Sequence, residues 1–184
     1  MAKDSGPRSA AADYIYEALV ELMDKKPYDQ ITITDITKKA GVSRMAYYRN
    51  YKDKDDILIE HYRSVLSQVK DRAARLSQKE YWTGYVQRSN QDPIFEHILR
   101  AGLLGKVYYL MLDTTKIFYQ TAYGLEMTDE KEVLMAYQKL GILMSYLIYR
   151  RDRPKRISTD VLADHLADLM VPGDFPGPEK DAVS

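Results

Sequence analysis

One stretch decides the fold of this chain: "ITITDITKKAGVSRMAYYRNYKDKDDIL", residues 31–58. Thr32 is followed three residues later by Asp35, which is the spacing of a capping box, so "ITIT" is interpreted as a loop that enters a helix. Gly41 ends this helix because glycine accepts a left-handed backbone angle, and Ser43 can cap the next helix. Two helices over 32–40 and 43–51, joined by a tight turn, have the size of a helix-turn-helix.

Two adjacent tyrosines in the second helix are expected to lie on different faces. At about 100° per residue, Tyr47 and Tyr51 fall within roughly 40° of each other, whereas Tyr48 lies on the flank. Tyr47 and Tyr51 are therefore predicted to pack against the apolar side of the first helix. The residues left facing outward are Arg44, Met45, Ala46, Tyr48 and Arg49. This outer face is the one that a DNA major groove would meet.

The charges of the chain cancel overall but are separated along the sequence. The 27 basic residues balance the 27 acidic ones, so any attraction to nucleic acid depends on where the charges lie. Residues 38–54 hold six cations and one anion, whereas residues 1–37 hold four cations and seven anions. Clustered cations beside hydroxyl groups are suited to phosphates. A solvated basic face is the alternative for charge alone, and the turn, the caps and the tyrosine positions favour DNA binding over it.

Residues 31–58 resemble the DNA-binding segment of the tetracycline-repressor (TetR) family of transcriptional regulators. Members typically show a threonine opening the second helix, an isoleucine within it, Ala-Gly-Val-Ser at the turn, and then a tyrosine, a bulky aromatic residue and a lysine at three-residue spacing. The corresponding residues here are Thr32, Ile36, Ala40 to Ser43, Tyr48, Tyr51 and Lys54. The resemblance extends over residues 9–60, and the remainder of the chain matches no motif of the family.

The resemblance implies specific roles at the DNA. Phosphate contacts are implied for Thr32, Ser43, Tyr48 and Lys54. Base contacts are implied for Arg44, Met45, Ala46 and Arg49. Met45-Ala46 stands where the family often has a small residue or proline followed by threonine, so apolar contact with a thymine methyl group is expected in place of one polar contact. This departure leaves the operator sequence open.

The remaining helix starts and stops predict an all-α fold of about nine helices. An N-terminal three-helix DNA-binding domain with the helix-turn-helix is expected over residues 9–53, after a disordered arm at 1–8. A larger C-terminal helical domain for ligand binding and dimerisation follows over 54–171, with helices expected near 54–69, 78–90, 93–103, 106–123, 128–149 and 158–170. Residues 172–184, rich in proline, glycine and charge, are expected to form a flexible tail.

The larger domain is rich in tyrosine, with 16 tyrosines and three phenylalanines in the whole chain. Tyrosine clusters suit a pocket for a flat or amphipathic molecule, which they hold by ring contact and hydroxyl hydrogen bonds. The candidate pocket residues are Trp82, Tyr85, Tyr108, Met111, Phe118, Tyr119 and Tyr137. An ordinary core with tyrosine hydroxyls reaching solvent is the alternative, and the family resemblance favours the pocket.

The helices over 128–149 and 158–170 carry broad apolar stripes that predict a dimer. One side of the first helix needs a further partner, and the two helices could form half of a four-helix bundle closed by a second copy. The candidate interface residues are Leu140, Met144, Ile148, Leu162, Leu166 and Leu169. A twofold dimer would set two recognition helices about 34 Å apart, as a palindromic operator requires. Burial of these stripes within the same chain is the alternative.

Several classes of protein are disfavoured by what the sequence lacks. Without cysteine there are no disulfides or thiolate metal sites, and His61, His97 and His165 show no metal-ligand spacing. No nucleophile motif or glycine-rich phosphate loop is present, so neither an enzyme nor a cofactor is predicted. The longest apolar run, residues 141–149, is about half of a membrane span. We expect a soluble, cytoplasmic protein.

Together these features predict a homodimeric DNA-binding transcriptional regulator of the TetR type. Repression, relieved when a small-molecule effector releases a palindromic operator, is the expected mode. One alternative is a TetR-like activator whose C-terminal domain binds a partner protein. The other is a helical ligand carrier without DNA binding. The effector, the operator and the regulated genes are not specified by the sequence.

Overall fold

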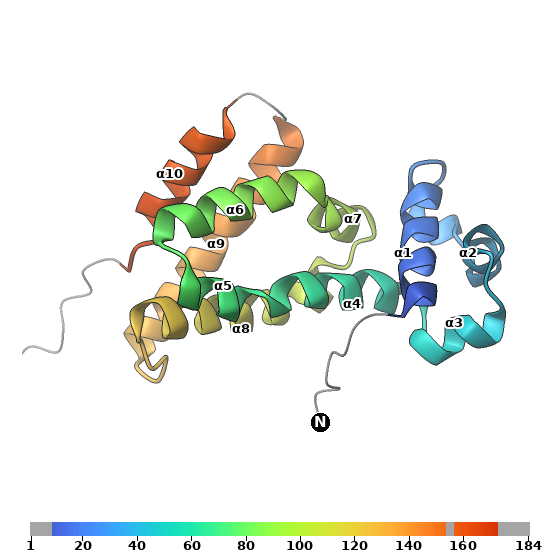
Figure 1. The fold of residues 1–184 in the computed structure, drawn as a ribbon, viewed down its shortest axis with the longest axis horizontal. Helices are drawn as coiled ribbons and strands as arrows, with labels where there is room; N and C mark the ends of the chain where they lie inside the picture. Colours follow the sequence, from blue (N-terminus) through green and yellow to red (C-terminus); the bar gives the residue numbers. More distant parts are fainter. Residues whose placement is uncertain (1–8, 154–156, 173–184) are drawn as a thin grey trace, which may run out of the picture. The chain divides into compact units, whose positions relative to one another are not determined.

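The computed structural model describes residues 9–153 and 157–172, and these are almost entirely helical (Figure 1). The predicted arm at 1–8, the tail from residue 173 and residues 154–156 lie outside the described residues. The elements are α1 (Ala10–Met23), the 3-10 helix η1 (Tyr28–Gln30), α2 (Ile33–Ala40), α3 (Arg44–Asn50), α4 (Lys54–Ser67), α5 (Val69–Arg75), α6 (Gln78–Gln91), α7 (Ile94–Arg100), α8 (Leu104–Tyr123), α9 (Glu130–Asp152) and α10 (Thr159–Met170).

The predicted all-α fold is confirmed, and each of the nine expected helices is present. The segment "ITIT" forms no strand, since Ile33 and Thr34 already belong to α2. The additional helix is α5, because the long helix expected from Lys54 ends at Ser67, with Gln68 as its C-cap, and a separate helix starts at Val69. No helix within residues 9–153 or 157–172 is both long and apolar enough to span a lipid bilayer.

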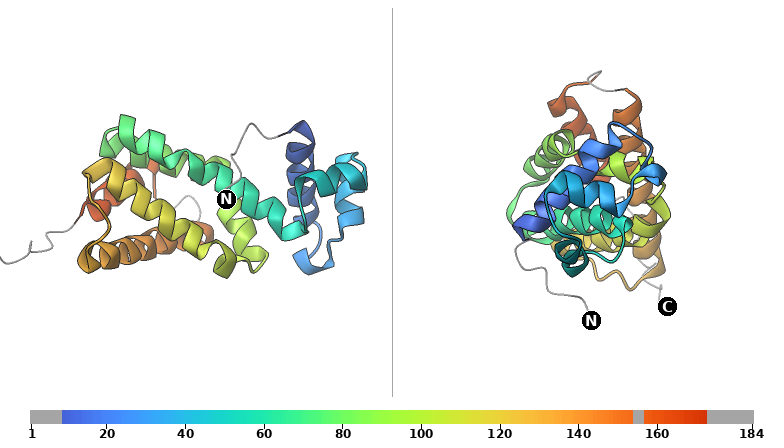
Figure 2. Two further views of the ribbon diagram at one scale, coloured as in Figure 1. Left: turned by 90° about the horizontal axis from the view of Figure 1, so that it is seen from below. Right: turned by 90° about the vertical axis from the view of Figure 1, so that its right-hand side faces the viewer.

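The chain divides into two compact units, and the first contains α1–α4, α7 and the start of α8. Figures 1 and 2 show α2 and α3 beside α1, and α1 contacts both of them as well as α4. The core of this unit is built from buried apolar side chains of these helices: Ile15, Leu19, Ile36, Tyr47, Ile57, Leu58 and Ile98. Burial of one side chain of this size stabilises a fold by about 1.5–3 kcal/mol. The helix-turn-helix is therefore held in place by packing on α1.

The second unit contains α5, α6, α9, α10 and the later part of α8. α10 packs along α6, as Figure 1 shows, and Lys79 of α6 pairs with Asp164 of α10 at 3.0 Å. Aromatic rings fill much of this core: Phe118 of α8 lies 4.7 Å from the ring of Tyr81 and 5.3 Å from that of Trp82, measured between ring centroids. The Tyr119 hydroxyl donates to the Met170 carbonyl at the end of α10, at 2.6 Å.

Candidate nucleic-acid interface

The turn between α2 and α3 has the backbone and capping geometry that the sequence predicted. The Thr32 hydroxyl accepts from the Asp35 backbone N–H at 3.1 Å while the Asp35 carboxylate accepts from the Thr32 N–H at 2.9 Å, which completes the capping box. Gly41 adopts φ 66°, the left-handed conformation in which side chains are strained. The Ser43 hydroxyl then accepts from the Ala46 N–H at 3.1 Å and starts α3. These contacts set the angle at which α3 leaves α2.

Of the two adjacent tyrosines of α3, Tyr47 lies in the core and Tyr48 faces solvent, as predicted. Tyr47 is 0% exposed, whereas Tyr48 is 53% exposed, and their rings meet edge to face at 5.3 Å. Tyr51 is also buried, and its hydroxyl donates to the Ala12 carbonyl of α1 at 3.4 Å. The Tyr47 hydroxyl is buried without a hydrogen-bond partner among the described residues. Tyr47 therefore holds α3 to the core, and Tyr48 is available to a ligand.

The outward face of α3 combines free cations with exposed apolar surface. Arg44, Tyr48 and Arg49 are exposed, and Met45 is 75% exposed. Ala46 lies half-buried between them. A methionine with this exposure contributes little to the core, since its apolar surface remains in water. The face therefore offers both guanidinium groups and an apolar contact to a partner.

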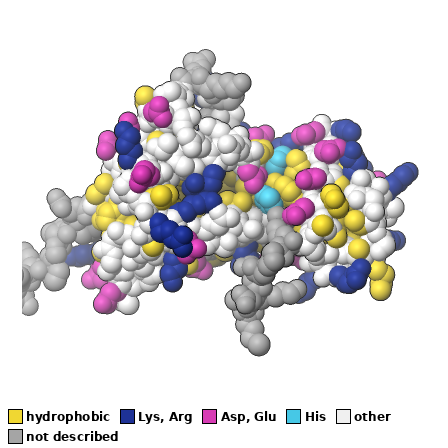
Figure 3. Space-filling model, in the orientation of Figure 1, with side chains coloured by type: hydrophobic (Ala, Val, Ile, Leu, Met, Phe, Trp, Pro, Cys, Tyr) yellow, Lys and Arg dark blue, Asp and Glu magenta, His cyan; other side chains and the backbone are white. Residues whose placement is uncertain are grey.

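Of the six cations between residues 38 and 54, four form no ion pair within the described part of the chain. These four are Lys38, Arg44, Arg49 and Lys52. Of the two remaining cations, Lys39 pairs with Glu21 of α1. Figure 3 shows Lys and Arg side chains along the outer edge formed by α2 and α3, and acidic side chains over α1. The separation of charge seen in the sequence is thus also a separation in space.

Lys54, for which the resemblance implied a phosphate contact, is engaged within the chain. Its ammonium group donates to the backbone carbonyls of Tyr28 at 2.6 Å and Ile31 at 3.0 Å, and it lies 4.3 Å from the centre of the Tyr28 ring. These bonds tie the start of α4 to the loop that precedes α2. In this arrangement Lys54 positions the helix-turn-helix relative to α4.

Side-chain contacts join the helix-turn-helix to later helices of the same unit. Asp55 at the start of α4 accepts from the Tyr28 hydroxyl and from the Lys106 ammonium of α8, both at 2.6 Å. Burial would raise the pKa of Asp55, but the bonds from Lys106 and Tyr28 outweigh it and lower that pKa. His61 of α4 bonds Asp92 at 2.6 Å and stacks on the Tyr16 ring of α1 at 3.6 Å. Sequence separations of 27 to 51 residues explain why no local pattern indicated these contacts.

The predicted pocket residues differ in how deeply they are buried. Trp82, Phe118 and Tyr119 are buried and pack ring against ring. Met111 is also buried, Tyr85 is half-buried beside Trp82, and Tyr137 is exposed on α9. Tyr108 is half-buried and belongs to the first unit. A role for these residues in ligand binding stays a prediction.

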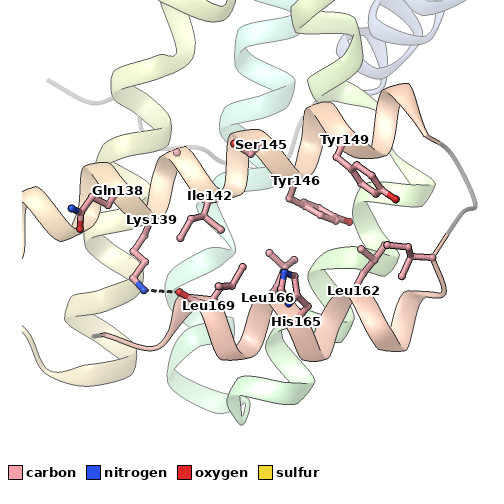
Figure 4. A pocket seen from close by; sticks show the side chains of 12 residues that line it. Gln138, Lys139, Ile142, Ser145, Tyr146, Tyr149, Leu162, His165, Leu166 and Leu169 are labelled. Atoms are coloured by element: carbon pink, nitrogen blue, oxygen red, sulfur yellow. Dashed lines mark hydrogen bonds between the residues drawn. The ribbon is translucent and has the colours of Figure 1, made fainter. Parts of the chain in front are cut away.

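The predicted dimer residues are divided between core and surface. Leu140 and Leu166 are buried within their own chain, whereas Met144, Ile148 and Leu162 are half-buried and Leu169 is exposed. Between α9 and α10 lies an open groove of about 850 Å³, across which their side chains face one another (Figure 4). The Lys139 ammonium bonds the Leu169 and Val171 carbonyls at 2.5 and 2.7 Å. Further exposed apolar residues on these helices, which the prediction omitted, are Leu134, Tyr137, Tyr149 and Val161.

Metal binding finds no support in the described residues, which contain no group of three or more His, Asp or Glu side chains suited to an ion. The His61 imidazole is hydrogen-bonded to Asp92, and His97 of α7 is buried. Burial, and then the charge of Arg100, lower the pKa of His97, so the imidazole is held neutral.

Comparison with known proteins identifies the first unit. Residues 15–60 match the family model described as "Bacterial regulatory proteins, tetR family". Among solved structures, the dihydroxyacetone kinase operon activator DhaS is similar with a TM-score of 0.65 at 14% identity, over 88% of this chain and 94% of that one. The fatty acid degradation regulator FadR from Bacillus halodurans gives 0.58 at 17% identity, over 94% and 99%. A TetR transcriptional regulator from Streptococcus agalactiae 2603V gives 0.59 at 17%, over 87% and 93%.

At these identities the solved structures establish the fold alone, and no curated protein gives a significant match. The family match covers the segment whose capped helices, left-handed glycine turn and exposed cationic α3 are described above. The family is one of regulators that carry out no catalysis. Residues 15–60 therefore form the DNA-binding segment of a transcriptional regulator of the TetR family.

Proposed function

We propose that this chain represses transcription as a homodimer bound to a palindromic operator, and that a small-molecule effector releases it. The outer face of α3 is the observation that carries the proposal. Cations of α2 and α3 that form no ion pair within the described residues flank the strongly exposed Met45 and Tyr48 there, and of these groups only the Tyr48 ring contacts the core, through Tyr47. Such a face has the dimensions and chemistry for insertion into a major groove.

Phosphates and bases would be contacted by different parts of this face. Thr32, Ser43 and Tyr48 are exposed and carry hydroxyl groups at helix starts or on α3, where they suit phosphate oxygens. Arg44 and Arg49 can donate two hydrogen bonds to guanine, and Met45 and Ala46 can contact thymine methyl groups. We assign Lys54 a supporting role, since its ammonium group is bonded to backbone carbonyls.

A second copy is proposed to cover the outer faces of α9 and α10. Val161 is 59% exposed and Leu169 is exposed on α10, with Leu134 and Tyr137 exposed on α9. Burial of these side chains in a twofold interface would remove apolar surface from water at about 25 cal/mol per Å². Val161→Glu would place charges in this interface, so it should dissociate the dimer in sedimentation experiments without loss of helicity. An unchanged dimer would reject this interface.

Release of the operator is proposed to act by population shift. An effector that prefers the conformation with wrongly spaced α3 helices lowers operator affinity by its differential binding. The contacts that support this proposal join η1, α4, α8 and the segment that precedes α7: Tyr28 to Asp55, Asp55 to Lys106, and His61 to Asp92. A displacement of α4 or α7 would therefore shift α2 and α3.

The decisive experiment selects bound fragments from random DNA and measures the salt dependence of the selected site. Four free cations per protomer, if all contact phosphate in a dimer, give a slope of log affinity against log salt of about −7. Arg44→Gln should reduce this slope by about 2 per dimer if Arg44 contacts phosphate, and should relax specificity without a change in slope if it reads a base. Failure to select any palindrome, or binding that ignores salt, would reject the proposal.

An activator that binds a partner protein is the second candidate, and one observation favours it. Trp82, Phe118 and Tyr119, three of the predicted pocket residues, are buried and pack ring against ring. Native mass spectrometry of the protein purified from its own cells distinguishes the two candidates. A bound small molecule supports the effector, whereas a bound protein supports the activator.

A further inference from the structure

Met45, near the start of α3, is the most exposed methionine in the described part of the chain, at 75%. The other methionines of residues 9–153 and 157–172 are shielded by the fold, since four are at most 5% exposed and two are half-buried: Met23, Met111, Met135 and Met170, and Met127 and Met144. The sequence contains no cysteine, so the methionine thioethers are its only sulfur groups. An oxidant that acts on sulfur therefore meets Met45 first, because susceptibility follows exposure.

The chemistry at this thioether is a two-electron oxidation by a peroxide. A lone pair of the Met45 sulfur attacks one oxygen of hydrogen peroxide, and the O–O bond breaks. The hydroxide that leaves takes the proton from the new S–OH group and becomes water. The sulfur is oxidised to a sulfoxide and the peroxide is reduced to water, so an apolar side chain becomes a polar one.

This oxidation leaves the fold of α3 in place, because other side chains make the contacts that hold the helix. The Ser43 hydroxyl caps its start by accepting from the Ala46 N–H at 3.1 Å, and the buried Tyr47 packs it on the core. Changes to an exposed side chain away from such contacts alter stability little. The polar product therefore acts on what α3 binds and not on the folded state.

At the DNA the same change weakens binding in two ways. Against thymine methyl groups the side chain is dehydrated, and a sulfoxide oxygen there is an acceptor without a donor. Arg49 is exposed and follows Met45 by four residues, so both lie on the same side of α3. Its guanidinium group can donate to the sulfoxide oxygen, which diverts it from guanine.

We propose that Met45 is a site of reversible oxidation, and that its conversion to the sulfoxide by peroxides releases the protein from DNA. Its exposure opens it to the oxidant and also to methionine sulfoxide reductases, which reduce the sulfoxide with two thiols and release a disulfide and water. Bound DNA covers Met45, so the free protein is the form that is oxidised. The effect on DNA rests on the proposed function, whereas the selective oxidation of Met45 does not.

Treatment of the full chain with hydrogen peroxide tests the selectivity. Peptide mass spectrometry follows the oxygen gained by each methionine over time, and circular dichroism follows helicity and melting. Met45 should be oxidised before Met127 and Met144, with the melting temperature unchanged. Oxidation of Met127 or Met144 ahead of Met45, or loss of helicity when Met45 alone is oxidised, would overturn the proposal.

The affinity for the selected operator is then compared before and after oxidation, for each variant separately. A sulfoxide acceptor left without a donor should weaken binding at least about fivefold for each oxidised protomer, and reductase treatment should restore it. Met45→Leu carries no sulfur at this position, so peroxide should not change its affinity, whatever that affinity is. Met127→Leu, in the second unit, is the matched control and should lose affinity on oxidation as the parent does. An equal loss in Met45→Leu and the parent, or no loss in the oxidised parent, would reject the switch.

These measurements separate the failure of the switch from the failure of the proposed function. If the parent binds its selected operator with the expected salt dependence and oxidation of Met45 leaves that affinity unchanged, the proposed function is retained and the switch is rejected. If the untreated parent selects no DNA, the proposed function and the switch both fail, and only the selective oxidation of Met45 is retained.

Discussion

Substitutions of the two adjacent tyrosines of α3 test which face of this helix packs against the core. Tyr47 is 0% exposed and packs against Tyr51, whereas Tyr48 is 53% exposed. Removal of a fully buried aromatic ring costs about 3–5 kcal/mol, so Tyr47→Ala should lose this amount of unfolding free energy. Tyr48→Ala should lose at most about 1 kcal/mol, the contribution of its edge-to-face contact with Tyr47.

A third variant separates the ring of Tyr47 from its hydroxyl. The hydroxyl has no hydrogen-bond partner among the described residues, and burial raises the pKa of this tyrosine, so it stays protonated. A buried polar group without a partner costs about 1–3 kcal/mol. Tyr47→Phe removes that cost and keeps the ring, so it should be as stable as the parent or more stable.

Urea unfolding followed by far-ultraviolet circular dichroism measures all three variants. In a protein of this size 1 kcal/mol corresponds to about 2–4 °C in melting temperature, so Tyr47→Ala should melt roughly 6–20 °C lower. The effect on operator binding should be the reverse: Tyr48→Ala should stay folded and bind the operator more weakly. If Tyr47→Ala unfolds within about 1 kcal/mol of the parent, or Tyr48→Ala is equally destabilised, the assignment of the two faces is refuted.

Three further predictions follow from single side chains. Lys54→Met loses charge-assisted bonds to backbone carbonyls, so it should lower the unfolding free energy by about 1.5–3 kcal/mol in a denaturation titration. Lys52→Met should leave this free energy unchanged and weaken only DNA binding, measured in a binding titration. Replacement of a contacted thymine by deoxyuridine should cost about 0.8 kcal/mol, about fourfold in affinity, and Met45→Ala should abolish that difference in a binding titration. Because the pKa of His97 is lowered on folding, stability should fall as pH drops below about 6.5, by at most about 1.4 kcal/mol per pH unit, and His97→Leu should flatten this part of the stability curve.

Local sequence patterns determined the helix-turn-helix because every signal in it acts over four residues or fewer. The capping box of Thr32 and Asp35, the left-handed Gly41 and the Ser43 cap are each satisfied within one helical turn. Helical periodicity likewise placed Tyr47 inside and Tyr48 outside. The same reasoning located the later helices, apart from the break at Gln68, which no glycine or proline marks.

The tertiary structure decided which of these residues remain available to a partner. Lys54 and Arg49 are both basic residues in one cationic run, yet the ammonium of Lys54 is bonded to carbonyls of residues 28 and 31, whereas Arg49 is exposed. Leu140 and Leu169 lie in similar apolar stripes, yet Leu140 is covered by its own chain. The partners that make these differences come from distant parts of the sequence.

The helix-turn-helix and the outward face of α3 could thus be predicted from the sequence, since short-range hydrogen bonds and helical periodicity specify both. The pairing of individual charges depends on the tertiary structure, from the Asp55 contacts with Tyr28 and Lys106 to the bonds of Lys54 with backbone carbonyls. The physical reason is that burial and ion pairing depend on contacts between helices, and the order of residues along the chain does not encode those contacts locally.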